Sequence, residues 1–125
     1  MNDPLQEWND PPLMNTTAPA PALLSSDGTL WLAYRIARDP HHCSVVRFDD
    51  VERYRFGEPP AALGLESLSE LARGSFYTVS GDGAVPRWLV TFPDAILEVR
   101  AGTARVVLRA AAALSPAHAL AALHA

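Results

Sequence analysis

Apolar and polar side chains alternate with a period of two in several short segments between residues 29 and 110, and this alternation constrains the fold more than any other feature of the chain. Successive side chains of a β-strand point to opposite faces of a sheet, so each segment is predicted to be a strand with one apolar face. The apolar positions predict the core: Leu30, Leu32, Tyr34, Ile36, Val46, Phe48, Tyr54, Phe56, Trp88, Val90, Phe92, Leu97, Val99, Val106 and Leu108.

Turn-forming residues separate these segments. Asp27-Gly28 and Gly81-Asp82-Gly83 predict turns, and Asp49-Asp50 predicts a tight break or a bulge. Pro93-Asp94 and Gly102-Thr103 predict two-residue hairpin connections. The strands are therefore predicted over residues 29–37, 43–49, 51–57, 75–80, 86–92, 95–101 and 104–110.

Two helices are predicted beside these strands. Ser67 and Glu70 fit a capping box, and Arg73-Gly74 ends this internal helix. Ser115 as the N-cap and Pro116 at the first helical position begin a C-terminal helix. The order of elements predicts an α+β fold: an antiparallel meander sheet of about six to seven strands, with the internal and the C-terminal helix packed together on its apolar face.

The N-terminal part of the chain lacks this pattern. Residues 1–22 hold five of the eleven prolines, which predicts an extended or mobile arm. Trp8 is expected to dock on the rest of the protein, with Leu5, Leu13 and Met14 as further anchors. Residues 23–125 are predicted to form a single α+β domain, long enough to bury one core.

The strand positions opposite in parity to the core carry most of the positive charge. Eight of the ten basic residues have this parity: Arg35, Arg47, Arg53, Arg55, Arg87, Arg100, Arg105 and Arg109. Trp31 shares it, and the acids Asp49 and Glu98 are its only counter-charges. Arg and Trp carry much of the binding energy in protein interfaces. We therefore interpret this face as a partner-binding surface made of Trp31, Arg35, Arg47, Arg53, Arg55, Arg87 and Arg100.

A plainer alternative stays open for the same face. The chain has no Lys, so Arg is the residue that must solvate an exposed sheet. The net charge of −4 argues against nucleic acid as the partner. No apolar run approaches the roughly 20 residues that cross a bilayer, so no membrane association is predicted. The lone Cys43 excludes an intrachain disulfide and suits the cytoplasm, which is the predicted location.

Three groups of residues have side-chain types that catalysis or metal binding uses. His41-His42-Cys43 brings together zinc-type ligands, but adjacent residues cannot close a tetrahedral site, and strand neighbours point to opposite faces. The carboxylates sit at turn signals, where they satisfy local backbone donors. No G-x-S-x-G elbow is present, and Gly81-Asp82-Gly83 is too short for a phosphate loop. The sequence therefore predicts no catalytic residue, no cofactor and no metal.

Four stretches carry a resemblance. They are residues 30–35, Val46-Arg47-Phe48, Tyr54-Arg55-Phe56-Gly57-Glu58-Pro59 and Val90-Thr91-Phe92-Pro93-Asp94. In these the chain resembles a group of small uncharacterised bacterial αβ proteins, in which a strand ends in Arg-Phe-Gly-x-Pro and a Thr-Phe-x-Asp turn follows later. The resemblance implies a compact αβ fold and a bacterial source, and it transfers no activity. Where those proteins have a polar, His-containing segment, residues 61–64 here are Ala-Ala-Leu-Gly.

These observations favour a non-catalytic, protein-binding module of the immunity or adaptor kind, which would bind an acidic surface of another protein through the Arg-rich face. Three other functions remain open for this chain. The same face could bind nucleic acid through phosphate contacts, or pack on a second copy of the chain as a homodimer. The aromatic interior could instead carry a small ligand, which requires a pocket of roughly 300 Å³ or more.

Overall fold

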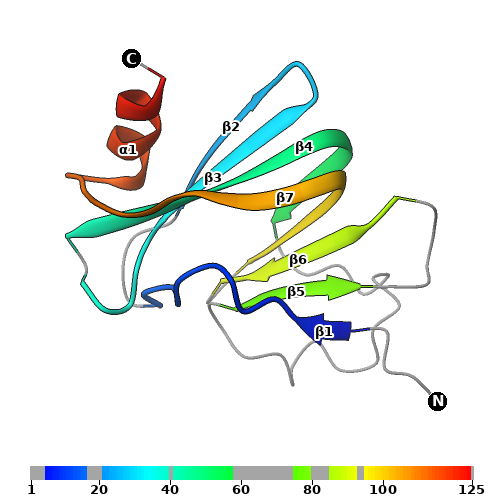
Figure 1. Ribbon diagram of the computed structural model, residues 1–125, viewed down its shortest axis with the longest axis horizontal. Coiled ribbons are helices and arrows are strands. Elements are labelled where there is room, and N and C mark those ends of the chain that lie inside the picture. Colours follow the sequence, from blue (N-terminus) through cyan, green and yellow to red (C-terminus); the bar gives the residue numbers. More distant parts are fainter. Residues whose placement is uncertain are drawn as a thin grey trace.

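The computed structural model describes residues 5–16, 21–39, 41–57, 75–79, 85–92 and 95–124. These residues form one antiparallel sheet of seven strands and a C-terminal helix (Figure 1). The elements are β1 (Leu5–Glu7), β2 (Ala22–Ser26), β3 (Thr29–Arg35), β4 (His42–Gly57), β5 (Phe76–Val79), β6 (Arg87–Thr91), β7 (Ile96–Ala112) and α1 (Pro116–Leu123). The described part of the chain contains no helix that is both long and apolar enough to cross a bilayer.

Two strands, β4 and β7, connect the whole sheet. The strand order is β1-β5-β6-β7-β4-β3-β2, so two sets of sequential strands, β2-β3-β4 and β5-β6-β7, meet where their last members pair. This pairing runs from His42 opposite Ala112 to Gly57 opposite Ile96. Both long strands bend, which sets β2, β3 and one half of each long strand above β5, β6 and β1 (Figure 1).

The face enclosed by this bend, called the inner face from here on, holds the main core. Aromatic rings from the two halves of the sheet meet across it: Tyr34 lies 5.3 Å from Phe76, and Phe48 lies 6.0 Å from Trp88, between ring centroids. The core predicted by period-two alternation is confirmed at most positions. The exceptions are Tyr54 and Phe56, which are 43% and 39% exposed, and Leu108, which belongs to a second cluster.

The second cluster lies on the opposite, outer face and corrects the predicted position of the C-terminal helix. Ala33 and Val45 on the sheet contact Ala119 and Leu120 of α1. The predicted start of this helix is confirmed, because Ser115 accepts a 3.0 Å hydrogen bond from the N–H of His118. The prediction that it covers the Leu/Val/Phe side is wrong. The bend of the sheet already covers that side, so the helix buries the small apolar patch behind it.

Two predicted strand pairs turn out to be single strands. Asp49-Asp50, predicted as a tight break or a bulge, lies inside the continuous strand β4, and the predicted hairpin turn at Gly102-Thr103 lies inside β7. Asp49 and Thr103 are opposite each other in the ladder, and Asp50 takes a left-handed φ of 54°. An added Cβ at Gly102 would come 3.1 Å from the Cβ of Asp50. These turn-type residues therefore allow two paired strands to bend together, rather than ending them.

The N-terminal residues supply two strands that the period-two pattern did not predict. β1 pairs with β5, and β2 pairs with β3 through a two-residue hairpin at Asp27 and Gly28, whose φ angles are 47° and 77°. Positive φ at both residues is the type I′ turn that suits the twist of a hairpin. The predicted internal helix at residues 67–73 and the turn at residues 81–83 lie outside the described residues.

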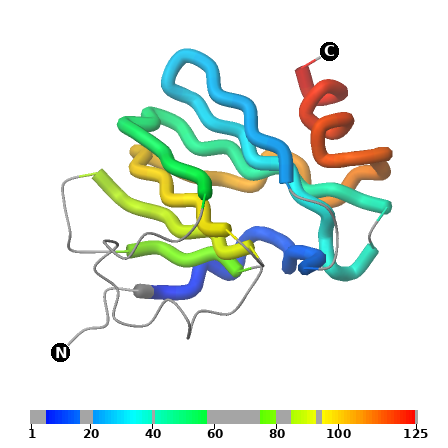
Figure 2. The backbone as a smooth tube through the Cα atoms, turned by 180° about the vertical axis from the view of Figure 1, so that it is seen from behind, coloured from blue at the N-terminus to red at the C-terminus, as the bar shows by residue number. Residues whose placement is uncertain are grey.

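Residues 8–16, called the N-terminal crossing segment from here on, run from β5 in one half of the sheet to the end of β3 in the other (Figure 2). The N–H of Trp8 donates to the carbonyl of Phe76 in β5 at 2.8 Å, and Met14 forms a bridge with Ile36 just after β3. The Tyr34 hydroxyl donates to the carbonyl of Pro12 at 2.7 Å, and burial raises the pKa of that hydroxyl far above its usual value. The half-buried indole of Trp8 packs on Phe76 and Trp88.

Because Trp8 is part of the core, replacing it should destabilise the whole protein. Trp8→Ala is expected to lower the free energy of unfolding by about 2–3 kcal/mol, since the ring is half-buried and its removal leaves a cavity. Leu13→Ala is the matched control, because Leu13 is 74% exposed, and its effect should stay within about 0.5 kcal/mol. Guanidinium denaturation measures both. Equal stability of the two variants would show that the crossing segment is not part of the cooperative fold.

Candidate functional site

All seven residues predicted to form a partner-binding surface lie on the outer face. The register shows this directly, because Trp31 lies opposite Arg47 and Arg87 lies opposite Arg100, while their sequence neighbours belong to the inner core. The full set, with Arg105 added, occupies four neighbouring strands: Trp31 and Arg35 on β3, Arg47, Arg53 and Arg55 on β4, Arg87 on β6, and Arg100 and Arg105 on β7.

Arg109 does not share this face, contrary to the prediction from parity. Between the pairs Val46–Val106 and Val45–Leu108, β4 advances one residue while β7 advances two, so β7 contains a bulge just before Arg109. A bulge reverses the side on which later residues point. Arg109 consequently reaches the N-terminal crossing segment, where its guanidinium donates to the Asp10 carboxylate at 2.6 Å and to the Asp10 carbonyl at 2.9 Å.

Helix α1 divides the outer face into a covered and an open part. At the border, Arg35 donates to the carbonyl of Leu114 at 2.6 Å, and the Trp31 ring meets the His124 ring edge-on at 4.6 Å. Arg47 is held in place on the open side of this border. Its Nε donates to Asp49 at 2.8 Å, and its guanidinium lies over the Trp31 ring at 5.6 Å.

Beyond Arg47 the open part of the face carries arginines directly opposite one another. Arg47 lies across from Arg105, and Arg53 lies across from Arg100. Like charges at such positions repel by about 0.2–1 kcal/mol, so this arrangement adds nothing to the stability of the sheet. Among the described residues, the exposed side chains of Arg53, Arg55 and Arg105 have no hydrogen bond or ion pair.

Two other arginines of the predicted surface are too buried to contact a partner well. Arg87 is only 8% exposed, and its Nε lies 3.8 Å from the Glu98 carboxylate. Arg100 is half-buried and donates to the carbonyl of Val85 at 3.2 Å. The surface that a partner can reach is therefore narrower than predicted: Arg47, Arg53, Arg55 and Arg105, with Trp31 at its edge. We call these five residues the cationic surface.

The side chains of His42 and Cys43, candidates for catalysis or metal binding by sequence, lie in different surroundings. Cys43 is fully buried between β3 and β7, and burial raises the pKa of its thiol. The Nδ1 of His42 instead lies 2.8 Å from the Asp39 carboxylate, at the exposed turn. The N–H of His41 donates to Asp39, which is the main reason that the pKa of Asp39 falls below its usual value. No three His, Cys, Asp or Glu side chains within the described ranges come together as a metal site.

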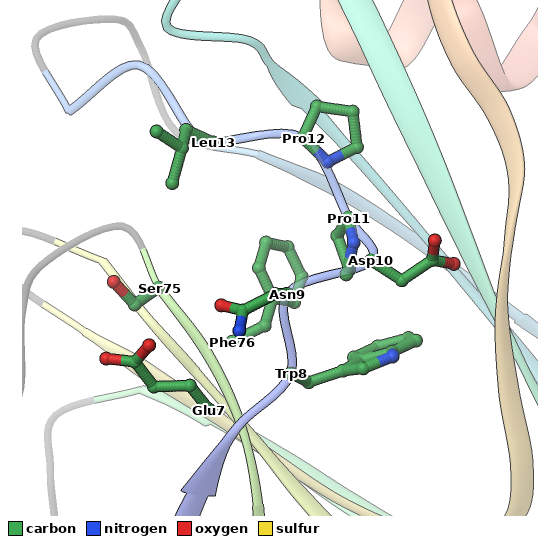
Figure 3. Close-up of a pocket in the computed structure, with 9 residues that line it drawn as sticks. All are labelled: Glu7, Trp8, Asn9, Asp10, Pro11, Pro12, Leu13, Ser75 and Phe76. Atoms are coloured by element: carbon green, nitrogen blue, oxygen red, sulfur yellow. The ribbon is translucent and has the colours of Figure 1, made fainter.

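Sequence reasoning missed a hollow of about 360 Å³ beside the N-terminal crossing segment (Figure 3). The segment from Glu7 to Leu13 lines one side, and Ser75 and Phe76 line the other. Asp10 turns away from this hollow toward β7, where it binds Arg109. Among the described residues the lining includes the Ser75 hydroxyl and the Glu7 carboxylate, and Trp8 and Phe76 connect the hollow with the aromatic core of the inner face. Its only sequence signal was the Trp and Leu within a Pro-rich segment.

Comparison of the chain with protein-family models, with curated proteins and with solved structures finds no match. The functional assignment therefore depends on the geometry of the chain itself.

The buried state of Cys43 has a direct chemical consequence. A thiol with a raised pKa holds little thiolate at mildly alkaline pH, and the surrounding strands exclude reagent. Ellman's reagent should therefore leave the native protein unmodified and react with Cys43 fully in denaturant. The free amino acid serves as the control for reagent activity. Rapid reaction of the folded protein would contradict the burial of Cys43 and reopen the His-Cys segment as a reactive site.

Proposed function

We propose that this protein is a non-catalytic binding module that engages an acidic surface of another protein through the cationic surface. One observation carries the proposal: among the described residues, Arg53, Arg55 and Arg105 are exposed guanidinium groups without an acidic partner, gathered on one face by the β4–β7 register. Guanidinium groups bind carboxylates with two parallel hydrogen bonds, which gives orientation as well as attraction. An adaptor or an immunity protein acts in this way, by covering the partner's surface.

The arrangement around Arg47 supports binding in a fixed orientation. Asp49 and the Trp31 ring hold this guanidinium before any partner arrives, so little side-chain entropy remains to be lost. An exposed ion pair contributes only about 0.2–1 kcal/mol, so the cationic surface works as a set rather than through one residue. Trp31, half-buried beside α1, adds apolar area at the edge.

Two competing uses of this surface have weaker support. A second copy would bring one array of arginines against another. The acids Asp49 and Glu98 on this face already lie beside Arg47 and Arg87 of their own chain, so repulsion opposes self-association. Nucleic acid would meet a molecule with a net charge of −4, although the local surface is positive. We place the protein in the cytoplasm in this proposal, because its one cysteine is a buried free thiol.

Charge reversal on the cationic surface tests the proposal. Arg53→Glu together with Arg55→Glu should weaken binding of a fluorescent oligoglutamate peptide by about tenfold or more, since two attractive pairs become repulsive. Arg38→Glu is the matched control, because Arg38 is an exposed arginine in the β3–β4 connection, away from this face. Fluorescence anisotropy at low and at physiological salt measures all three proteins.

Unchanged binding by the double variant would remove the ground for this function. A single-stranded oligonucleotide of equal charge is the second probe. If it binds more tightly than the peptide, with a steep loss as salt is added, nucleic acid takes the place of protein as the partner.

A further inference from the structure

Among the described residues, the second half of β4 has a neighbouring strand, β7, on one side only. β3 pairs with β4 from Cys43 to Phe48, and the last contact of the β2–β3 hairpin with β4 is the N–H of Val51 donating to the carbonyl of Gly28 at 2.8 Å. Beyond Val51, β4 continues to pair with β7 as far as Gly57. On the side away from β7, none of the described residues pairs with this stretch, so half of its backbone N–H and C=O groups face outward.

This open edge is exposed on both faces as well. Glu52, Arg53, Tyr54, Arg55 and Phe56 form a run of five exposed residues inside a strand, whereas the paired stretch before the bend is mostly buried. Two of the five are the aromatic residues for which alternation predicted a place in the core. A strand with free backbone groups and exposed aromatic side chains is a template for another strand.

The two faces of the edge differ in chemistry. Arg53 and Arg55 point to the outer face, because they lie opposite Arg100 and Glu98. Tyr54 and Phe56 lie opposite Val99 and Leu97 of the inner core, and the Phe56 ring meets the Phe92 ring at 5.4 Å. A strand added here would place alternate side chains beside guanidinium groups and beside aromatic rings.

We propose that the edge of β4 over residues 53–57 binds an extended peptide segment in which acidic and apolar residues alternate, as one more strand of the sheet. This inference rests on the proposed function, because it names the form of the acidic partner that the cationic surface binds. The peptide's carboxylates pair with Arg53 and Arg55 on the outer face, and its apolar side chains cover Tyr54 and Phe56 on the inner face. Backbone hydrogen bonds supply the rest of the affinity.

A second copy of this chain is a poorer occupant of the edge. Pairing β4 with its own copy would set Arg53 and Arg55 of one molecule beside the same residues of the other, on the same face. Charged side chains at an exposed edge are a common protection against such self-pairing. Arg53 and Arg55 thus repel the same strand of a second copy and attract a strand with acidic side chains.

Two synthetic peptides that have the same amino-acid composition but a different residue order test the proposal. A peptide of alternating Glu and Val should bind about tenfold more tightly than a peptide with the same residues in two blocks, because only the alternating order presents acids and apolar groups to separate faces. Two further forms of the alternating peptide carry N-methyl groups, either on every Val or on every Glu. In an added strand only one of these sets donates to β4, so one form should lose binding and the other should keep it.

The protein variants separate the two faces of the edge. Tyr54→Ser with Phe56→Ser should reduce the advantage of the alternating peptide over the block peptide, and Arg53→Glu with Arg55→Glu should weaken binding of both. The matched control is Arg38→Glu, and circular dichroism confirms that each variant is folded. Amide chemical shifts of residues 52–57 locate the bound peptide.

The outcomes distinguish this inference from the proposed function. If both orders bind equally and the arginine variant weakens both, the cationic surface binds acids but the edge receives no strand. If the two N-methylated forms bind alike, whether well or poorly, strand addition is wrong. If no acidic peptide binds at all, the proposed function and this inference fail together.

Discussion

The antiparallel pairing of β4 with β7 is the interaction on which the rest of the sheet depends. It joins two sets of strands that, among the described residues, pair with each other nowhere else, and its bend brings their apolar faces together. A sheet that folds over itself in this way needs no helix to cover its main core. The one helix in the described part of the chain is therefore free to pack behind the sheet, over Ala33 and Val45.

The bend also determines what the outer surface can do. Asp50 takes its left-handed conformation where β4 stops pairing with β3, so among the described residues β4 has two neighbouring strands before the bend and one, β7, after it. The β4–β7 register then gathers four arginines on the outer face, beyond the border of α1. The cationic surface and the open edge thus arise from the same irregularity, and they adjoin along the same strand.

Much of this arrangement could be predicted from sequence, because burial on one face of a strand imposes period-two alternation. This holds for Leu30, Leu32 and Tyr34 in β3, and for the arginines of β4. The start of α1 was readable from Ser115 and Pro116, since capping is a local interaction. The open edge was not readable, because Tyr54 and Phe56 have the parity of the core and only the departure of β3 leaves them exposed.

The errors share a physical origin in residues that allow more than one backbone geometry. Asp49-Asp50 and Gly102-Thr103 suit a turn and a bend inside a paired strand equally well, and only the pairing partner decides between them. One bulge in β7 was enough to send Arg109 to the inner side, toward Asp10. Helix α1 packs on the face opposite to the predicted one, because the bend of the sheet already covers the Leu/Val/Phe side.

The long β4–β7 ladder has a consequence for how the protein is made. Residue 42 pairs with residue 112, so β4 leaves the ribosome well before the strand that completes it. Until then the β2–β3–β4 unit presents an apolar face and an unpaired edge to solvent, and non-local pairing of this kind is slow to form. Nascent chains of this protein should therefore depend on holding chaperones, and translation speed through β5 and β6 should influence how much of the product folds.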